Sequence, residues 1–319
     1  MGLIDWLRRL FGATEPFAEG DFAGGRPRPQ GRLGLMDLSQ RLGMTVSDLQ
    51  AVPVHYDRFT IPKRTGGTRT ILAPAPPLKQ LQRRLLRRLL GRLRAHPAAM
   101  GFERGRSIVT NALPHVGAAV VLRMDVQDFF PSTAEHRVRQ YFTGIGWDDE
   151  AAALLLRWTT CDGGLPQGAP TSPRLSNLVN YRMDARLAGL AGRYGGVYTR
   201  YADDLTFSFR VDDRRANEAM QPIRRIAAGH GYRLHRRRKL SVRRRHQRQE
   251  VTGLVVNQRL ALPRRTRRWL RAVEHRVAAG GRATLTPEQL AGWRAFAAMV
   301  DGGSPAQPSG PTTGLRPVS

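Results

Sequence analysis

Two adjacent acids, Asp203 and Asp204, lie in RYADDLTFSF, among apolar and aromatic residues that otherwise predict a β-strand. Acids are depleted from strand interiors because a buried charge loses its water. A third acid, Asp125, ends the apolar stretch VVLRMD. Paired strands would bring the three carboxylates together, where they repel one another unless cations neutralise them. Mg²⁺ binds such carboxylates together with substrate phosphates, and two ions can clamp the attacking and leaving oxygens of phosphoryl transfer.

The structural alternative makes Asp203 and Asp204 a polar hairpin turn and Asp125 a helix cap. The charge of the chain favours the chemical interpretation. Its 319 residues include 52 Lys and Arg against 25 acids, a net charge of +27, which indicates a polyanionic partner such as nucleic acid. The rival partner is an acidic membrane surface, but no uncharged apolar stretch of about eighteen residues exists to span a membrane. Cys161 is alone, which argues against a disulfide framework or a cysteine zinc site and fits a cytoplasmic location.

The elements that must position these acids alternate between strand and helix. The pattern predicts an α+β fold, with an antiparallel or mixed sheet covered by helices on one face. Ser47 and Asp48 are expected to cap a helix, and Gly66–Gly67 to turn a hairpin. The expected helices are at 35–52, 76–96, 133–146, 148–160, 214–232 and 264–300, and a Gly/Pro-rich loop is expected to run into a further helix within 163–193. The expected strands are at 58–74, 118–125, 196–209 and 251–263.

Three stretches in this order, DVQDFFPS, GLPQGAPTSPRLSN and YADD, resemble the motifs of reverse transcriptases, and the resemblance runs from about Ile61 to Arg276. It implies a right-hand polymerase architecture with fingers, a ferredoxin-like palm (antiparallel sheet plus helices) and a small helical thumb. It makes Asp125, Asp203 and Asp204 the catalytic carboxylates and ligands of two Mg²⁺ ions. The carbonyl group of Val126 would assist as a further metal ligand.

The resemblance also implies a division of the chain. Residues 1–30 would form an N-terminal helix and linker, and 31–118 the N-terminal helices and fingers. The palm would cover 119–250, with an inserted fingers segment at about 135–175. The thumb would cover 251–300, and 301–319 would be a disordered tail.

A nucleotide site follows from the same resemblance. Lys63 and Arg69 would reach the triphosphate, where cations offset the charge developing on the leaving group. Gln167 and Gly168 would pack on the nucleotide and the template base. Phe130 would exclude ribonucleotides, and Lys239 would lie near the leaving pyrophosphate. Each assignment has an ordinary alternative. Lys63 and Arg69 could belong to a solvated basic hairpin, and Gln167 and Gly168 to a Pro-rich loop. Phe130 could be a core phenylalanine, and Lys239 a contact to the phosphate backbone.

Two further stretches narrow the family. NALPHVGA resembles the Asn-Ala-x-x-His signature of retron reverse transcriptases, and VTGLVVN resembles their Val-Thr-Gly signature. The structural alternative for both signatures is a local turn beside a capped strand. In the basic helix that follows, Trp269 either packs in the core or stacks on RNA. RNA contacts are implied for Asn111, His115, Val251, Thr252, Gly253 and, in the basic thumb helix, Arg267 and Arg268.

A retron enzyme copies part of a structured non-coding RNA from its own locus into single-stranded DNA, starting from the 2′-hydroxyl group of a branching guanosine. The implied partners are this RNA, the RNA–DNA hybrid, deoxynucleoside triphosphates and an effector protein of anti-phage defence, without a membrane. Two alternatives remain open. One is an RNA-binding scaffold with vestigial polymerase activity that controls a toxin, and the other is an abortive-infection polymerase that works without a template.

Overall fold

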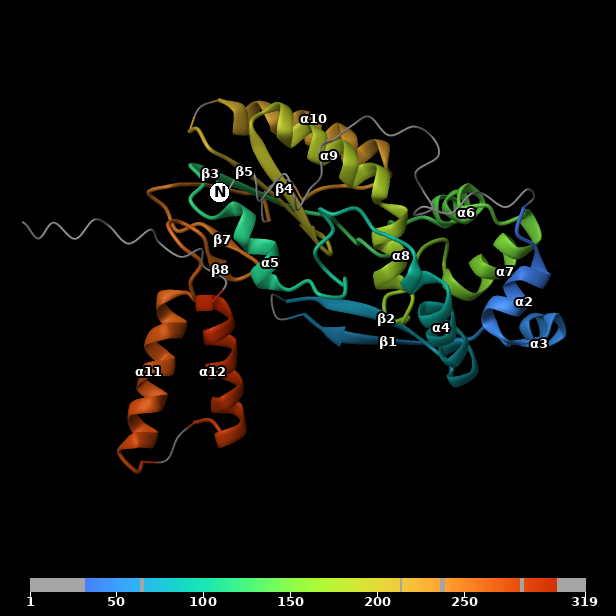
Figure 1. The fold of residues 1–319 in the computed structure, drawn as a ribbon, viewed down its shortest axis with the longest axis horizontal. Coiled ribbons are helices and arrows are strands. Elements are labelled where there is room, and N and C mark those ends of the chain that lie inside the picture. The colour runs from blue at the N-terminus through green and yellow to red at the C-terminus, as the bar shows by residue number, and fades with distance from the viewer. Residues whose placement is uncertain (1–31, 64–65, 213, 236–238, 282–283, 303–319) are drawn as a thin grey trace, which may run out of the picture.

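The computed structural model describes residues 32–63, 66–212, 214–235, 239–281 and 284–302 (Figure 1). At its centre lies a four-stranded antiparallel sheet in the order β4-β5-β3-β6. The expected α+β fold is confirmed, and the sheet is antiparallel rather than mixed. Its strands are β3 (Val120–Asp125), β4 (Gly196–Tyr201), β5 (Asp204–Phe209) and β6 (Ser241–Arg244).

Helices α9 (Tyr181–Arg193) and α10 (Arg215–Gly229) cover one face of this sheet (Figure 1). Alternate residues of β3, among them Val120 and Leu122, join the apolar core beneath these helices. Val121 points to the opposite face and joins a smaller core with α5 (Ile108–Ala112) and the hairpin of β7 (Glu250–Val251) and β8 (Leu254–Val255). A strand that packs on both faces needs apolar residues at successive positions, which explains the VVLRM run.

A second core lies beside the sheet and contains the buried Trp147 and Trp158. The hairpin of β1 (Tyr56–Pro62) and β2 (Thr68–Pro74) extends from this region with the expected antiparallel pairing. The helices around the core are α2 (Leu35–Leu42), α3 (Val46–Ala51), α4 (Pro76–Arg88), α6 (Glu135–Gly144), α7 (Asp149–Thr159) and α8 (Ser172–Val179), and the short 3₁₀ helices are η1 (Leu90–Arg92) and η2 (Leu113–His115).

The helix expected over 35–52 is broken into α2 and α3. Gly43 ends α2 in the left-handed conformation (φ 63°), which glycine adopts without strain. The expected caps Ser47 and Asp48 are wrong, because the side chain of Thr45 caps α3 and accepts the backbone N–H of Asp48 at 3.0 Å. The cap therefore lies two residues earlier, since a side-chain acceptor must precede the helix whose free N–H groups it binds.

Helices α11 (Arg264–Ala278) and α12 (Pro287–Gly302) lie side by side and stand apart from the body (Figure 1). Leu270 and Leu290 pack between them, and the rings of Trp269 and Trp293 meet edge-to-face at 5.1 Å. The expected N-terminal helix and linker lies outside the described residues, as does the tail beyond Gly302. No helix in the described ranges is long and apolar enough to cross a membrane.

Candidate active site

The strand register brings Asp125 and Asp204 together. They are directly opposite each other where β3 pairs with β5, so their side chains share one face of the sheet. Asp203 lies in the two-residue turn between β4 and β5, and its carbonyl accepts the N–H of Val126 at 2.9 Å. This main-chain bond fixes the turn to the end of β3. Acids distant in sequence therefore meet at one end of the sheet.

Burial disfavours the ionised forms of Asp203 and Asp204 and so raises the pKa of each. Burial raises the pKa of Asp203, and the neighbouring Asp125 carboxylate raises it further, by its charge and by a side-chain hydrogen bond. Burial also raises the pKa of Asp204, although the Arg123 guanidinium opposes this shift. A cation at Asp125 and Asp203 would relieve both effects.

Two basic side chains already contact the acids. The ammonium group of Lys239 donates to Oδ1 of Asp125, and Nη2 of Arg123 donates to Oδ2 of Asp204. Nε2 of His235 lies 3.5 Å from the same Asp125 oxygen. Lys239 was expected near the site from its sequence context, whereas Arg123 was missed, although it lies two residues before Asp125 and therefore on the same face of β3.

The residues fit a metal site that is completed by substrate. In the part of the chain that the structure describes, no group of three or more His, Cys, Asp or Glu side chains is arranged to hold a metal ion. The carboxylates of Asp125 and Asp203 are adjacent, whereas that of Asp204 is paired with Arg123. Few carboxylates together with substrate phosphates is the ligand set that Mg²⁺ favours, so Asp125 and Asp203 fit it.

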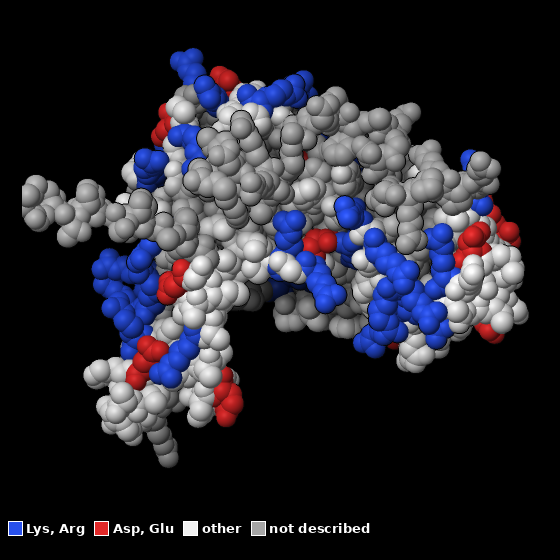
Figure 2. Space-filling model, viewed as in Figure 1, with Lys and Arg blue, Asp and Glu red and all other residues white. Residues whose placement is uncertain are grey.

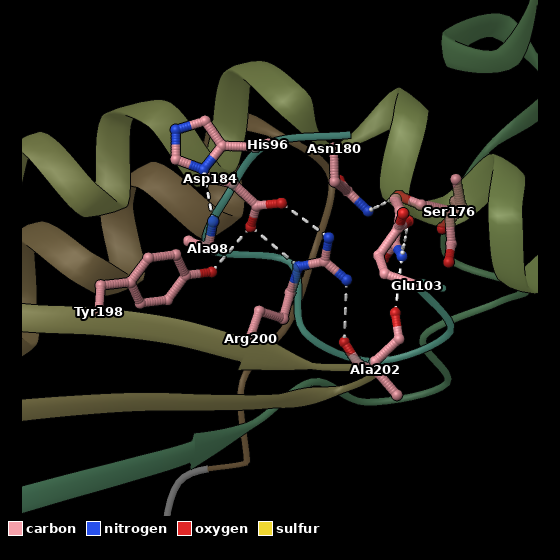
Figure 3. A network of polar contacts seen from close by, with 12 residues as sticks. His96, Ala98, Glu103, Ser176, Asn180, Asp184, Tyr198, Arg200 and Ala202 are labelled. Atoms are coloured by element: carbon pink, nitrogen blue, oxygen red, sulfur yellow. Dashed lines mark hydrogen bonds and ion pairs between the residues drawn. The ribbon is translucent and has the colours of Figure 1, made fainter. Parts of the chain in front are cut away.

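A buried ion pair supports the turn from behind (Figure 3). Nε and Nη2 of Arg200 donate to the two carboxylate oxygens of Asp184 at 2.9 and 2.7 Å, and both side chains are fully buried. The remaining nitrogen, Nη1, donates to the carbonyl oxygen of Ala202 at 3.2 Å. Tyr198 donates its hydroxyl to Asp184 at 2.9 Å. These contacts link α9 to the residue that precedes Asp203, and no sequence motif predicted them.

The turn itself is tightly constrained. Ala202 has a positive φ of 57°, which a two-residue hairpin turn requires but which is uncommon for alanine. Gly101 passes so close that a Cβ atom there would lie 2.7 Å from the backbone nitrogen of Ala202. The N–H of Met100 donates to the carbonyl of Arg200 at 2.7 Å. The segment around Gly101 therefore packs against the turn that carries Asp203 and restricts its position.

The residues assigned to the nucleotide come from three elements. Lys63 and Arg69 are exposed, Lys63 at the turn of the β1–β2 hairpin and Arg69 on β2. The carbonyl of Gln167 accepts the N–H of Leu72 at 2.8 Å, which attaches the LPQG loop to this hairpin. Gly168 has φ 130°, and a Cβ atom there would lie 2.8 Å from the Leu72 carbonyl oxygen, so this loop requires glycine.

The two phenylalanines that follow Asp125 have different environments. Phe129 is 5% exposed and stacks on Tyr232 with ring centroids 5.7 Å apart. Phe130 is only half-buried, and its ring lies 6.0 Å from that of the exposed Phe102. Phe129 is therefore the fully packed residue, whereas Phe130 packs against two cores and keeps part of its surface exposed.

The retron-like signatures contact one another behind the sheet. Nδ2 of Asn111 donates to the hydroxyl of Thr252 at 3.3 Å, and that hydroxyl donates to the carbonyl of Ile108 at 3.1 Å. Thr252 and Gly253 form the positive-φ turn between β7 and β8, which agrees with the structural alternative. Asn111 and Val251 are fully buried, so they do not reach RNA directly in this conformation.

His115 is also fully buried, between the hydroxyl groups of Ser208 and Thr199 at 2.7 and 2.8 Å. Burial lowers its pKa to about 3, so the imidazole is neutral at physiological pH. The contacts favour the structural interpretation of His115.

The basic helix α11 presents Arg267 and Arg268 to solvent. Lys and Arg side chains cover this helix in Figure 2, and a hollow separates the α11–α12 pair from the body. Trp269 is 37% exposed and contacts Trp293 edge-to-face, so it lies at the surface of the helical pair rather than in its core.

Comparisons with known proteins identify the family of the chain. The family described as reverse transcriptase (RNA-dependent DNA polymerase) matches residues 61–254. The chain is 41% identical over 292 residues to the retron Mx65 reverse transcriptase of Myxococcus xanthus, covering 83% of this chain and 68% of that protein. It is 39% identical to the retron Mx162 reverse transcriptase of the same organism, of which it covers 63%, and 34% identical to the retron Ec86 reverse transcriptase of Escherichia coli, of which it covers 84%.

Among solved structures, the telomerase of Candida albicans in complex with a fragment of telomeric RNA matches with a TM-score of 0.48 and 11% identity, covering 71% of this chain and 48% of that one. The apo telomerase of Candida tropicalis matches with a TM-score of 0.45 and 11% identity, covering 66% and 55%.

Proposed function

This chain belongs to the reverse transcriptase family, as a retron-type bacterial member, and we propose that it copies part of a cognate structured RNA into single-stranded DNA from a 2′-hydroxyl group. The adjacency of Asp125 and Asp203 at the end of the sheet is the observation that carries this proposal. Asp125 and Asp203 would hold a divalent cation there, and the cation would offset the repulsion between the two carboxylates.

In the proposed reaction, the primer oxygen bonds to the α-phosphorus of a deoxynucleoside triphosphate, and the bond to pyrophosphate breaks. Two bound Mg²⁺ ions would lower the pKa of the primer hydroxyl and offset charge on the leaving oxygens. Asp125 and Asp203 would hold the metal, with Asp204 and the carbonyl of Val126 beside them. Arg200 and Gly101 would keep the turn in place.

The exposed cations of the β1–β2 hairpin would bind the triphosphate, because Lys63 and Arg69 have no acid that competes for them among the described side chains. Lys239, whose ammonium group contacts Asp125, would contact the pyrophosphate. Phe130, the half-buried phenylalanine, would press against the sugar where a ribonucleotide carries its 2′-hydroxyl group. Gln167 and Gly168 would pack on the incoming nucleotide and the template base.

We assign fingers to residues 31–118 and about 135–175, the palm to 119–250 and the thumb to 251–300. The position of the central sheet within 120–244 and the separate α11–α12 pair support this division. The cognate non-coding RNA and an effector protein of anti-phage defence would be the partners in the cytoplasm. The resemblance to retron enzymes supports the assignment of these two partners.

The substitution Asp203→Asn tests the proposal. We expect it to abolish DNA synthesis, because it removes the carboxylate adjacent to Asp125 while keeping the size of the side chain. RNA affinity should stay within about twofold of wild type, since the substitution changes no basic contact. The measurement is primer extension with Mg²⁺ on the cognate RNA, together with RNA binding at constant salt.

The matched control is Asp212→Asn, which removes an exposed acid paired with Arg244. It should synthesise DNA normally, because exposed ion pairs contribute little. Wild-type protein that binds RNA and incorporates no nucleotide would instead identify a scaffold, and untemplated product would identify an abortive-infection polymerase.

A further inference from the structure

Helix α4 lies within a long stretch without acids. Between Asp57 and Glu103 the sequence contains no Asp or Glu, yet α4 alone carries Lys79, Arg83, Arg84, Arg87 and Arg88. Its apolar face is fully used, since Leu78, Leu81 and Leu85 are buried in the second core. The five cations therefore lie outside the apolar face that packs in this core.

Two of the five cations have a structural role. Nη1 of Arg88 donates to the carbonyl of Leu42 at 2.9 Å, and Nη1 of Arg84 donates to the carbonyl of Gly43 at 3.3 Å. These carbonyls end helix α2, where free acceptors and the negative end of the helix dipole attract cations. Arg84 and Arg88 thus join α4 to α2.

The other three cations form a row. Lys79, Arg83 and Arg87 are exposed and four residues apart, so they lie on one side of the helix at intervals of about 6 Å. In the described ranges, none of these side chains forms a hydrogen bond or an ion pair with an acid. Like charges at this spacing destabilise a helix, so the row has a cost that no internal contact with an acid offsets.

Figure 2 shows that Lys and Arg side chains gather over α4, on the other side of the hollow from α11. Arg92 and Arg94, which follow the helix in the chain, are also exposed. Basic surfaces of this kind bind phosphates and release counterions. We propose that Lys79, Arg83 and Arg87 form a second RNA-binding surface, which holds a duplex stem of the RNA outside the catalytic site.

The chemistry of the surface favours a duplex over a single strand. Proteins that bind single strands combine cations with aromatic side chains on which the bases stack. The α4 face exposes no aromatic residue, because the helix contains none. A duplex presents its phosphates and hides its bases, so a row of cations on a rigid helix suits it. This inference rests on the proposed function only in taking RNA as the partner.

The test removes the row and compares it with an equal charge change elsewhere. One variant carries Lys79→Gln, Arg83→Gln and Arg87→Gln. The control carries Arg186→Gln, Arg193→Gln and Arg225→Gln, three exposed arginines on α9 and α10. The probes are a generic RNA duplex of about two helical turns and a single-stranded RNA of the same length, and binding is measured by fluorescence anisotropy across a series of salt concentrations.

We expect the α4 variant to bind the duplex at least about tenfold more weakly at low salt. The slope of log affinity against log salt should become shallower by about one for each phosphate that the variant no longer binds, and so by up to about three. The control variant should keep the wild-type slope, and binding of the single strand should change less than about twofold. If duplex binding weakens equally in the α4 variant and the control, net charge alone explains the affinity and the proposal is overturned. If the α4 variant loses as much affinity for the single strand as for the duplex, the duplex assignment is overturned.

Two further measurements separate this proposal from the proposed function. The α4 variant should extend a short pre-annealed template–primer at the wild-type rate, because that substrate carries no distant stem, whereas Asp203→Asn should not. The melting temperature of the α4 variant should equal or exceed that of wild type, since like-charge repulsion is relieved. A lower melting temperature would mean that the row is structural, and would overturn the proposal.

Discussion

At the scale of single residues, the site combines acids whose ionisation is unfavourable with cations that compensate for it. Asp203 is half-buried beside Asp125, and Lys239 and Arg123 each contact one carboxylate. The acids were predictable from YADD and from Asp125 at a strand end. The position of the Arg123 side chain beside the acids follows from the alternation of side chains along β3, once the strand register is known. The Asp184–Arg200 pair was not predictable, because it joins a helix to a strand through tertiary packing alone.

The raised pKa of Asp203 predicts a pH dependence of stability without metal. A carboxyl whose pKa is higher in the folded state stabilises the fold below its ordinary pKa of 3.8, and this contribution is lost as pH rises through the higher folded value. We expect the melting temperature of metal-free wild type to fall, relative to Asp203→Asn, as pH rises from about 4 to about 7. Thermal melts in a chelating buffer measure this. A variant that is equally less stable at every pH would contradict the assignment.

The Asp184–Arg200 pair should affect both stability and catalysis, and a double substitution separates the two. Arg200→Met leaves a buried carboxylate unpaired and should cost about 3–5 kcal/mol of unfolding free energy. The double variant Asp184→Asn with Arg200→Met removes both charges and should recover most of that loss. It should not recover the rate of nucleotide incorporation, because the Ala202 carbonyl still lacks the Arg200 donor.

Urea unfolding and single-nucleotide incorporation measure the two effects. A double variant with both wild-type stability and wild-type rate would show that the pair is only structural. Retention of Mg²⁺-dependent thermal stabilisation in the same variant would show that the metal ligands themselves are intact.

At the scale of elements, most helices and strands were predictable from periodicity, whereas their ends were not. The β4–β5 hairpin and the LPQG loop leading to α8 lie where expected. The break at Gly43 and the cap at Thr45 were missed, because a helical pattern continues across the break. The retron-like signatures were assigned to RNA contact, but burial of Asn111 and His115 is a tertiary property that a short motif does not reveal.

The contact between the two signatures predicts a structural effect at the base of the α11–α12 pair. The Nδ2 atom of Asn111 donates to the Thr252 hydroxyl, while its Oδ1 atom has no hydrogen-bond partner among the described residues. Thr252→Val keeps the shape and removes the hydroxyl, and should cost about 1–3 kcal/mol of unfolding free energy. We expect shorter DNA products, since the helical pair departs from this region.

Product length on a long template and urea unfolding test this. The matched control is Thr143→Val, whose hydroxyl donates to a carbonyl of its own helix. Single-nucleotide incorporation by the Thr252 variant should remain near wild type. A catalytic defect at unchanged stability would place Thr252 in contact with substrate instead.

At the scale of the whole molecule, composition predicted the class of partner, and the fold shows how the charge is distributed. The net charge of +27 indicated a polyanion, and Lys and Arg side chains cover α11 and α4 on the two sides of the hollow (Figure 2). The sequence also predicted a helical segment at the C-terminal side, but not its separation from the body. That separation depends on which apolar helix faces pack against one another, and only the packed structure determines this.

The central claim is that Asp125 and Asp203 together bind a divalent cation. The most direct measurement is the change in melting temperature on adding Mg²⁺, compared among wild type, Asp125→Asn, Asp203→Asn and the control Asp212→Asn. We predict that Mg²⁺ raises the melting temperature of wild type and of Asp212→Asn, and leaves those of Asp125→Asn and Asp203→Asn unchanged. A rise of the same size in all four proteins would contradict the claim.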